Sequence, residues 1–277
     1  MGKVGNTRLF KRRSGAAIIP PILKEGIRFP YGPFRFKIVL PKGTEYSILA
    51  STDLANWLTI SNGIAMEEAV EYVDSDASKN NHRFYRVTAG DEVSSANILG
   101  FASITLPPGF SLIANPLDGQ SNAISDLFKE WPDGTALNKF DTRLFKLAEN
   151  AVVRGKWSNP SERLLPGEGA IFFNPTSDYK THSFVGDVLH GQPSIPIPSG
   201  FSMRSSLIPR LGGLVEDLGF PIADGDVIHL FDRDQQKYNL HPYEEGKWKA
   251  GPPIVGIGES FWAAKSEAGN WVEKFTL

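Results

Sequence analysis

The chain has 277 residues, a formal net charge of −2 and no cysteine. These values exclude disulfides, thiolate nucleophiles and cysteine-ligated zinc or iron–sulfur centres, and they argue against a chain built as a whole to bind a polyanion. With 27 glycines and 20 prolines, the composition predicts turns and short strands rather than long helices. The length is sufficient for two or more domains.

Residues 1–33 are predicted to form a basic, flexible head. They contain one acidic residue, Glu25, against seven basic ones: Lys3, Arg8, Lys11, Arg12, Arg13, Lys24 and Arg28. Such a segment contacts RNA or anionic lipid in some proteins, but a solvated leader is the commoner role. Nucleic acid is therefore considered a partner of this head only. The apolar stretch that follows is broken by Pro20 and Pro21, so no signal peptide and no membrane span are predicted.

Residues 34–89 are predicted to form a small β-sandwich. Phe34, Phe36, Ile38 and Leu40 alternate with polar residues, which is the pattern of a half-buried strand. Further short strands and turn signals follow to residue 89, and Trp57 is the expected core anchor. Residues 90–100 are small and polar, and they are interpreted as a linker.

Two units follow, at residues 101–189 and 190–277, and they match at a fixed offset of 91 residues. The motifs Gly-Phe-Ser, Asp-Gly, Phe-Asp, Gly-Lys-Trp and Gly-Glu recur in the same order, beginning at Gly109, Asp133, Phe140, Gly155 and Gly167 in the first unit. Each unit is expected to be β-rich with one short helix, from "AISDLFKEW" and "GLVEDLGF". Because a unit of this size buries too little surface alone, the two are expected to pack as one domain about a pseudo-two-fold axis.

"YSILASTDLANWLTI", followed by "HRFYRV", resembles a fibronectin-type-like module found in large extracellular proteins of Verrucomicrobia and Planctomycetes. The downstream "PPGFSLIANPL" and "PGEGAIFFNP" are similar to an uncharacterised repeat beside that module. The resemblance implies a fibronectin- or immunoglobulin-like sandwich followed by the duplicated unit. It also implies an extracellular or cell-surface location, although the lack of a recognisable signal peptide leaves the cytoplasm open. It brings no catalytic residues to this chain.

The motifs of common hydrolases are missing. Ser260 in "GESFW" lacks the second glycine of the G-x-S-x-G nucleophile elbow, and Gly169 stands at its position in the first unit. His182, His190, His229 and His241 could pair with a serine and an aspartate, since catalytic triads have no fixed order in sequence. A hydrolase with a site near the repeat interface is therefore kept as the alternative function.

Calcium is the only cofactor that the sequence suggests, since it requires only oxygen ligands. Asp224, Asp226, Asp232 and Asp234 place four carboxylates near two predicted strand ends of the second unit. The competing explanation is that aspartate stabilises turns through its side chain. The first unit has Thr135 and Arg143 at the positions of Asp226 and Asp234, so a calcium site would belong to the second unit alone.

Aromatic residues are the predicted binding residues. Trp157 and Trp248 occupy the repeated Gly-Lys-Trp, while Tyr243, Trp262 and Trp271 occur only in the second unit. Such rings suit contact with a protein or a glycan, although a tryptophan kept in both copies also suits a core. The sequence thus predicts a non-catalytic accessory, adhesion or binding protein of a bacterial surface or secreted assembly, with the calcium-assisted hydrolase as the alternative.

Overall fold

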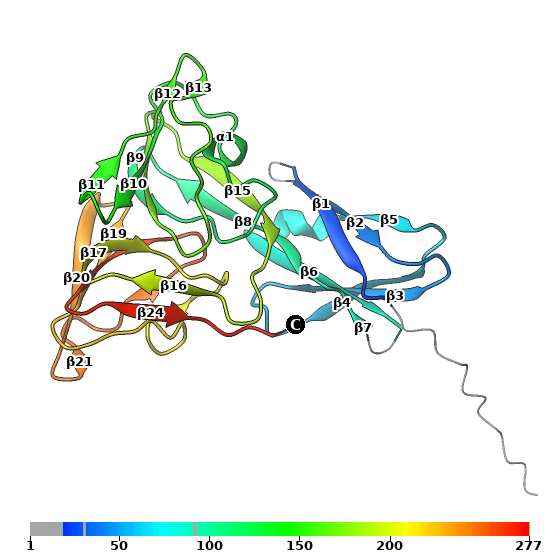
Figure 1. Ribbon diagram of the computed structural model, residues 1–277. Helices are drawn as coiled ribbons and strands as arrows, with labels where there is room; N and C mark the ends of the chain where they lie inside the picture. The colour runs from blue at the N-terminus through cyan, green and yellow to red at the C-terminus, as the bar shows by residue number, and fades with distance from the viewer. Residues whose placement is uncertain (1–18, 30–31, 91–92, 277) are drawn as a thin grey trace, which may run out of the picture.

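The computed structural model describes residues 19–29, 32–90 and 93–276 (Figure 1). The described chain consists mainly of antiparallel strands, with one short α-helix and one 3₁₀-helix, so the prediction of a mainly β fold is confirmed. No helix in these ranges is long and apolar enough to span a membrane. The basic residues from Lys3 to Arg13 lie outside the described residues.

Two facing sheets form the first part of the molecule, on the right of Figure 1. One has the order β1 (Ile22–Arg28), β2 (Phe34–Val39), β5 (Ala69–Asp74). The other has the order β4 (Leu58–Ile64), β3 (Glu45–Ser51), β6 (His82–Ala89), β8 (Leu99–Leu106), β15 (Lys180–Asp187), with β7 (Val93–Ser94) paired to β6 and a 3₁₀-helix, η1, at Ser75–Lys79.

Aromatic rings fill the space between these sheets. Phe34 and Phe36 of β2 are fully buried, as the alternation predicts, and they contact Tyr85 of β6 at ring-centroid distances of 5.2 and 4.9 Å. Phe101 of β8 completes the cluster, 5.3 Å from Phe34. Trp57 is not part of this core. It is partly buried beside a second apolar cluster, under the guanidinium of Arg86, so its prediction as the core anchor was wrong.

The sandwich extends beyond residues 34–89 at both ends. β1 lies within the segment predicted to be a flexible head. Leu23 is buried against the core, but its neighbours Lys24 and Glu25 are exposed, so the sequence of this strand reads as polar. β8 begins at Leu99, inside the predicted linker, and pairs with β15 over its full length. Leu99 packs into the sandwich core and Ile104 into the next core, so this strand contributes to two hydrophobic cores.

The two units of the second part have strands at matching positions. The first contains β9 (Gly109–Ile113), α1 (Ile124–Leu127), β10 (Ala136–Asp141), β11 (Lys146–Ala148), β12 (Val152–Val153), β13 (Lys156–Trp157) and β14 (Ala170–Asn174). The second contains β16 (Ser194–Ile197), β17 (Gly200–Arg204), β18 (Gly212–Gly213), β19 (Val227–Asp232), β20 (Lys237–Glu244), β21 (Lys247–Trp248), β22 (Ile254–Val255), β23 (Phe261–Lys265) and β24 (Gly269–Val272). β9, β10 and β14 begin and end 91 residues before β17, β19 and β23, and the sheets share the orders β11-β10-β14-β9 and β20-β19-β23-β17.

Contacts between the units also occur in pairs related by 91 residues. Ile113 at the end of β9 forms a β-bridge with Glu259, and Arg204 at the end of β17 forms one with Glu168. The duplication itself is an inference from the sequence. The reciprocal bridges are the contacts that two similar units packed about a pseudo-two-fold axis make.

The units differ in their helical segment. Residues 124–127 form α1, but the corresponding "GLVEDLGF" forms hydrogen-bonded turns, so the prediction of a helix in the second unit was wrong. Gly219, at a φ of 67°, ends the turns where the first unit has Phe128. A glycine adopts this left-handed conformation at little cost, and the buried ring is supplied one residue later by Phe220.

Gly169 and Ser260, 91 residues apart, face each other where the units meet. A Cβ atom built on Gly169 would lie 2.7 Å from the Cβ of Ser260, which is closer than two such atoms can approach. The contact therefore has room for one side chain, and the two copies differ here for a steric reason.

Candidate functional site: an aromatic face and a pocket between the units

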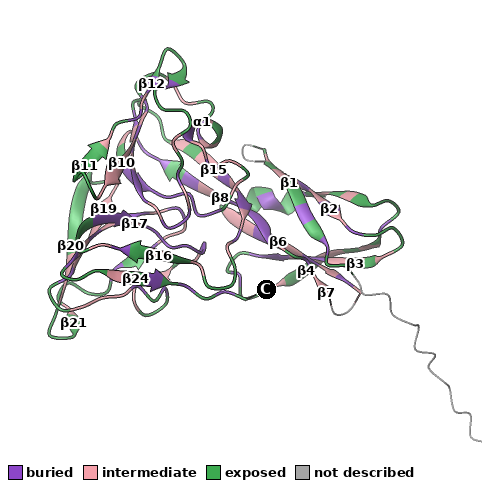
Figure 2. Ribbon diagram, in the orientation of Figure 1, coloured by how far each residue is buried: buried purple, intermediate pink, exposed green. Residues whose placement is uncertain are grey.

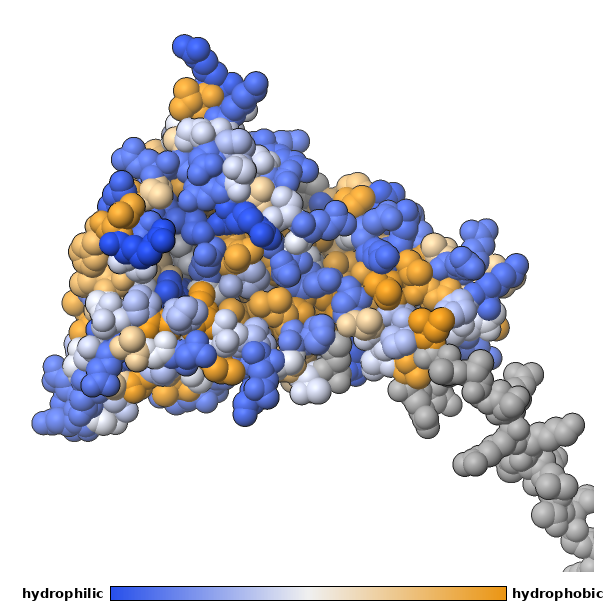
Figure 3. All heavy atoms as spheres, viewed as in Figure 1, coloured by the Kyte–Doolittle hydropathy of each residue, from blue (hydrophilic) through white to orange (hydrophobic). Residues whose placement is uncertain are grey.

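The outer faces of the two sheets of the second part are apolar. Alternate residues of a strand point to opposite sides, and an exposed antiparallel sheet normally carries polar residues on its solvent side. Here the outward positions are occupied by Phe110, Phe140, Leu147, Ile171 and Phe173 in the first sheet and by Phe201, His229, Phe231, Tyr238, Leu240 and Trp262 in the second. β11 and β20 are exposed strands in Figure 2, and apolar side chains gather along the same margin in Figure 3.

A shallow groove crosses this face between the units. Phe140, Phe145, Phe201, His229, Tyr238 and Trp262 line its volume of about 320 Å³. The Phe140 and Trp262 rings meet edge to face at 4.9 Å, and Trp262 Nε1 donates a hydrogen bond to Tyr238 Oη at 3.2 Å. Burial lowers the pKa of His229, so its ring is neutral near pH 7. The groove thus presents aromatic surface and few hydrogen-bonding groups.

The β10–β11 turn places Phe145 on the groove. Asp141 accepts hydrogen bonds from the backbone N–H groups of Arg143 and Leu144, at 2.8 and 3.1 Å, and these bonds fix the turn. Phe145 then has a φ of 51°, and its ring, 65 % exposed, lies 6.4 Å from Phe201 of the other unit.

The matching β19–β20 turn of the second unit is used differently. Asp232 accepts from the N–H groups of Asp234 and Gln235, and Gln236 has the same φ of 51° as Phe145. Gln236 forms two hydrogen bonds with the backbone of Phe110, accepting from N at 2.9 Å and donating to O at 2.8 Å. The turn of the first unit therefore exposes the Phe145 ring, whereas the turn of the second unit forms hydrogen bonds with the first unit.

Trp262 is the one predicted binding residue that lies in the groove. Trp157 and Trp271 are core residues whose indole N–H groups donate to Phe128 O and Leu218 O at 2.9 and 2.8 Å, so predicting them as binding residues was wrong. Tyr243 and Trp248 pack on each other at 5.0 Å in the β20–β21 hairpin, outside the groove.

Sequence reasoning did not predict the other five rings of the groove as binding residues, although it considered His229 for catalysis. Phe140, Phe201 and His229 belong to strands with apolar residues on both faces. That pattern gives no indication of which face is exposed.

The four aspartates predicted to bind calcium do not converge on one position. In the part of the chain that the structure describes, no group of three or more His, Asp or Glu side chains is arranged to hold a metal ion. Asp226 is fully buried and forms an ion pair with Lys265. Burial opposes its charge, but hydrogen bonds from Lys265 and Ser266 hold its pKa below the ordinary value. Asp224 accepts from Gly246 N at 2.9 Å, which is a turn-stabilising role.

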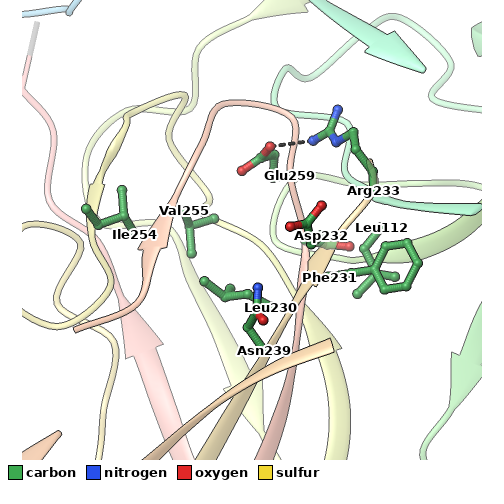
Figure 4. Close-up of a pocket in the computed structure, with 10 residues that line it drawn as sticks. Leu112, Leu230, Phe231, Asp232, Arg233, Asn239, Ile254, Val255 and Glu259 are labelled. Atoms are coloured by element: carbon green, nitrogen blue, oxygen red, sulfur yellow. Dashed lines mark hydrogen bonds and ion pairs between the residues drawn. The ribbon is translucent and has the colours of Figure 1, made fainter. Parts of the chain in front are cut away.

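A second hollow, of about 240 Å³, lies at the contact between the units (Figure 4). Its apolar wall is formed by Leu112, Leu230, Phe231, Ile254 and Val255, and its polar groups belong to Asp232, Arg233, Asn239, Glu259 and Ser260. Arg233 and Glu259 form an ion pair across it. Ser260 is buried, and its Oγ has no hydrogen-bond partner among the described residues.

The pocket lining includes serine and two acids but no histidine, so Ser260 has no imidazole beside it to accept its proton. His182 is also in an apolar setting. Within the described part of the chain its Nε2 is enclosed without a hydrogen-bond partner, its ring stacks on Phe128 at 4.3 Å, and burial lowers its pKa to about 3. His229 lines the aromatic groove instead. Neither His182 nor His229 belongs to the lining that contains Ser260, so neither is placed to act as its base.

A scan against protein-family models finds no match to this chain, and a search of curated proteins finds none either. The resemblance to a fibronectin-type-like module and its neighbouring repeat therefore depends on the quoted residues alone.

Proposed function

We propose that the protein is a non-catalytic binding protein that docks an apolar surface of a partner protein on the aromatic face. The observation that carries this proposal is the reversal of the usual sheet pattern, with aromatic residues where an exposed sheet is normally polar. Six residues of this face are substantially exposed: Phe110, Phe145, Leu147, Phe201, Tyr238 and Leu240. They present on the order of 600 Å² of side chain.

This area supports a protein partner. It is at the upper limit of the largest apolar patch on a typical monomer and approaches the ~800 Å² per partner of a stable interface. Aromatic residues are also enriched at the centres of protein interfaces. A glycan fits less well, because the lining of the groove offers only the Tyr238 hydroxyl and the His229 ring as hydrogen-bonding side chains besides the Trp262 N–H. The bacterial surface as the site of action rests on the sequence resemblance alone.

Peptide display against the immobilised chain tests the proposal. Selected peptides are expected to carry apolar residues at alternate positions, which suit an exposed sheet face. Their binding is expected to fall at least about tenfold in a Phe145→Ser, Phe201→Ser double variant. Leu58→Ser is the matched control, because Leu58 is 69 % exposed on β4, in the sandwich.

Two results would identify a different occupant of this face, and a third would refute the face as a binding site. Quenching of tryptophan fluorescence by oligosaccharides but not by peptides, lost in a Trp262→Phe variant, would identify a glycan site instead. Self-association abolished by the double variant would make the partner a second copy of this chain. Peptide binding that is equal in the double variant and in Leu58→Ser would refute the assignment of this face.

A further inference from the structure

Lys139 and Leu230 occupy matching positions in the two units, 91 residues apart, on β10 and β19. Each points to the inner side of its sheet. Lys139 pairs with Ala148 of β11, and Leu230 pairs with the matching residue of β20, Asn239. In the first unit the Lys139 ammonium donates to the carbonyl oxygen of Arg163 at 2.7 Å and to Glu168 Oε2 at 2.8 Å. Leu230 is shorter and carries no charge, so the second unit lacks this ammonium.

The acceptors that hold the ammonium in the first unit have counterparts in the second. Ile254 matches Arg163 and Glu259 matches Glu168, and both line the hollow between the units. β18 and β22 pair Gly213 with Ile254, and the backbone N–H of the next residue, Leu214, donates to Pro253 O at 2.9 Å. Hydrogen-bonded and non-hydrogen-bonded pairs alternate along an antiparallel ladder, so Gly213 and Ile254 form a non-hydrogen-bonded pair. The Ile254 carbonyl is therefore not used in the pairing of β18 with β22.

Glu259 retains the geometry of Glu168. Glu168 Oε2 accepts from Leu165 N at 2.8 Å as well as from Lys139, and Glu259 Oε2 accepts from the matching Gly256 N at 3.0 Å. Arg233 bonds to the other oxygen, Oε1, and to Thr105 O. Oε2 of Glu259 therefore accepts one backbone hydrogen bond, as Oε2 of Glu168 does, but it has no counterpart of the bond from Lys139.

The charge of the hollow suits a ligand that carries a cation. Asp232 and Glu259 outnumber Arg233, which leaves a net negative charge beside an apolar wall (Figure 4). An apolar stem that ends in a cation complements this combination.

We infer that this hollow binds the alkylammonium group of a ligand, which takes the place that Lys139 fills in the first unit. The ammonium donates to Glu259 Oε2 and the Ile254 carbonyl, and the stem packs on Leu230 and Val255. The group can come from a free amine or from a lysine side chain of a partner. The hollow and the aromatic groove share no lining residue, so the inference stands independently of the proposed function.

Chemical-shift titration of the isotope-labelled chain tests the inference. The probes are n-butylammonium and a capped lysine pentapeptide, with n-butanol and the Nε-acetyl-lysine pentapeptide as uncharged controls. We expect saturable shifts at the amides of Gly256, Glu259 and Ser260 below about 10 mM of a charged probe, and none with the controls. Shifts with both charged probes or with the amine alone indicate a free amine, and shifts with the peptide alone indicate a lysine of a partner.

Leu230→Lys is the decisive variant, because it supplies the second unit with its own ammonium. We expect it to weaken probe binding at least about tenfold, whereas Leu230→Met, which keeps the site uncharged, changes binding less than about threefold. Glu259→Gln is expected to weaken binding as well, and it keeps the test open if Leu230→Lys fails to fold. Absence of saturable shifts in the wild-type chain, or binding by folded Leu230→Lys equal to that of Leu230→Met, would overturn the inference.

Discussion

Replacement of Gly169 by alanine tests how the two units are held together. The new Cβ would lie 2.7 Å from the Cβ of Ser260, 2.9 Å from its Oγ and 3.1 Å from the Cβ of Met203. Because Gly169 does not have a positive φ, the alanine backbone itself is unstrained, and loss of unfolded-state entropy favours the variant by about 0.4–1 kcal/mol. Overpacking costs about 1–3 kcal/mol. The expected net result is a decrease of about 1–2 kcal/mol in the free energy of unfolding.

Urea denaturation of four proteins measures this effect: the wild type, Gly169→Ala, Ser260→Gly and the double variant. If the two positions compete for one space, Gly169→Ala is destabilising in the wild-type background and close to neutral when Ser260 is replaced by glycine. The coupling between the positions is then about 1 kcal/mol or more. Gly269→Ala is the control, since its nearest neighbour is Pro221 at an ordinary 3.7 Å. Equal cost of Gly169→Ala in both backgrounds would refute the steric argument.

Three further predictions concern buried groups. Trp271→Ala is expected to lower the free energy of unfolding by about 3–5 kcal/mol, and Trp262→Ala by distinctly less, because only Trp271 is fully buried. Lys265→Met is expected to cost about 3–5 kcal/mol by leaving Asp226 charged and buried, which thermal or urea unfolding would reveal; a neutral result would contradict the ion pair. His182 has a pKa of about 3 when folded and near 6.5 when unfolded, so only the unfolded chain gains its proton between these values. Stability is expected to fall by up to about 1.4 kcal/mol per unit as the pH drops below 6.5, and a His182→Phe variant should lose this part of the slope.

The strands and their turns could be predicted from the sequence because short-range rules determine them. Alternation of Phe34, Phe36 and Ile38 gave the buried face of β2 directly. The repeated Asp-Gly and Gly-Glu pairs likewise mark backbone positions: Gly134 and Gly225 have φ of 88° and 90°. Such features depend on a few neighbouring residues and are visible in one sequence.

The candidate sites could not be predicted in the same way, because they depend on which faces pack together. Trp157 and Trp262 are both tryptophans in strands, yet one is in a core and the other on the groove. The sequence places part of β8 in a linker because the pairing partner of this strand, β15, lies some 80 residues away in the chain. Only the assembled sheets determine which of the two apolar faces of β10 and β19 remains exposed.

The differences between the two units are more informative about function than their similarities. Positions that match, such as Asp141 and Asp232, stabilise the same turn in each unit and therefore describe the fold. Three of the positions that differ lie at or beside the contact between the units: Gly169 with Ser260, Lys139 with Leu230 at the pocket, and Phe145 with Gln236 beside the groove. Once one copy of a unit holds a turn or fills a hollow, the other copy is free to use the equivalent surface for a ligand.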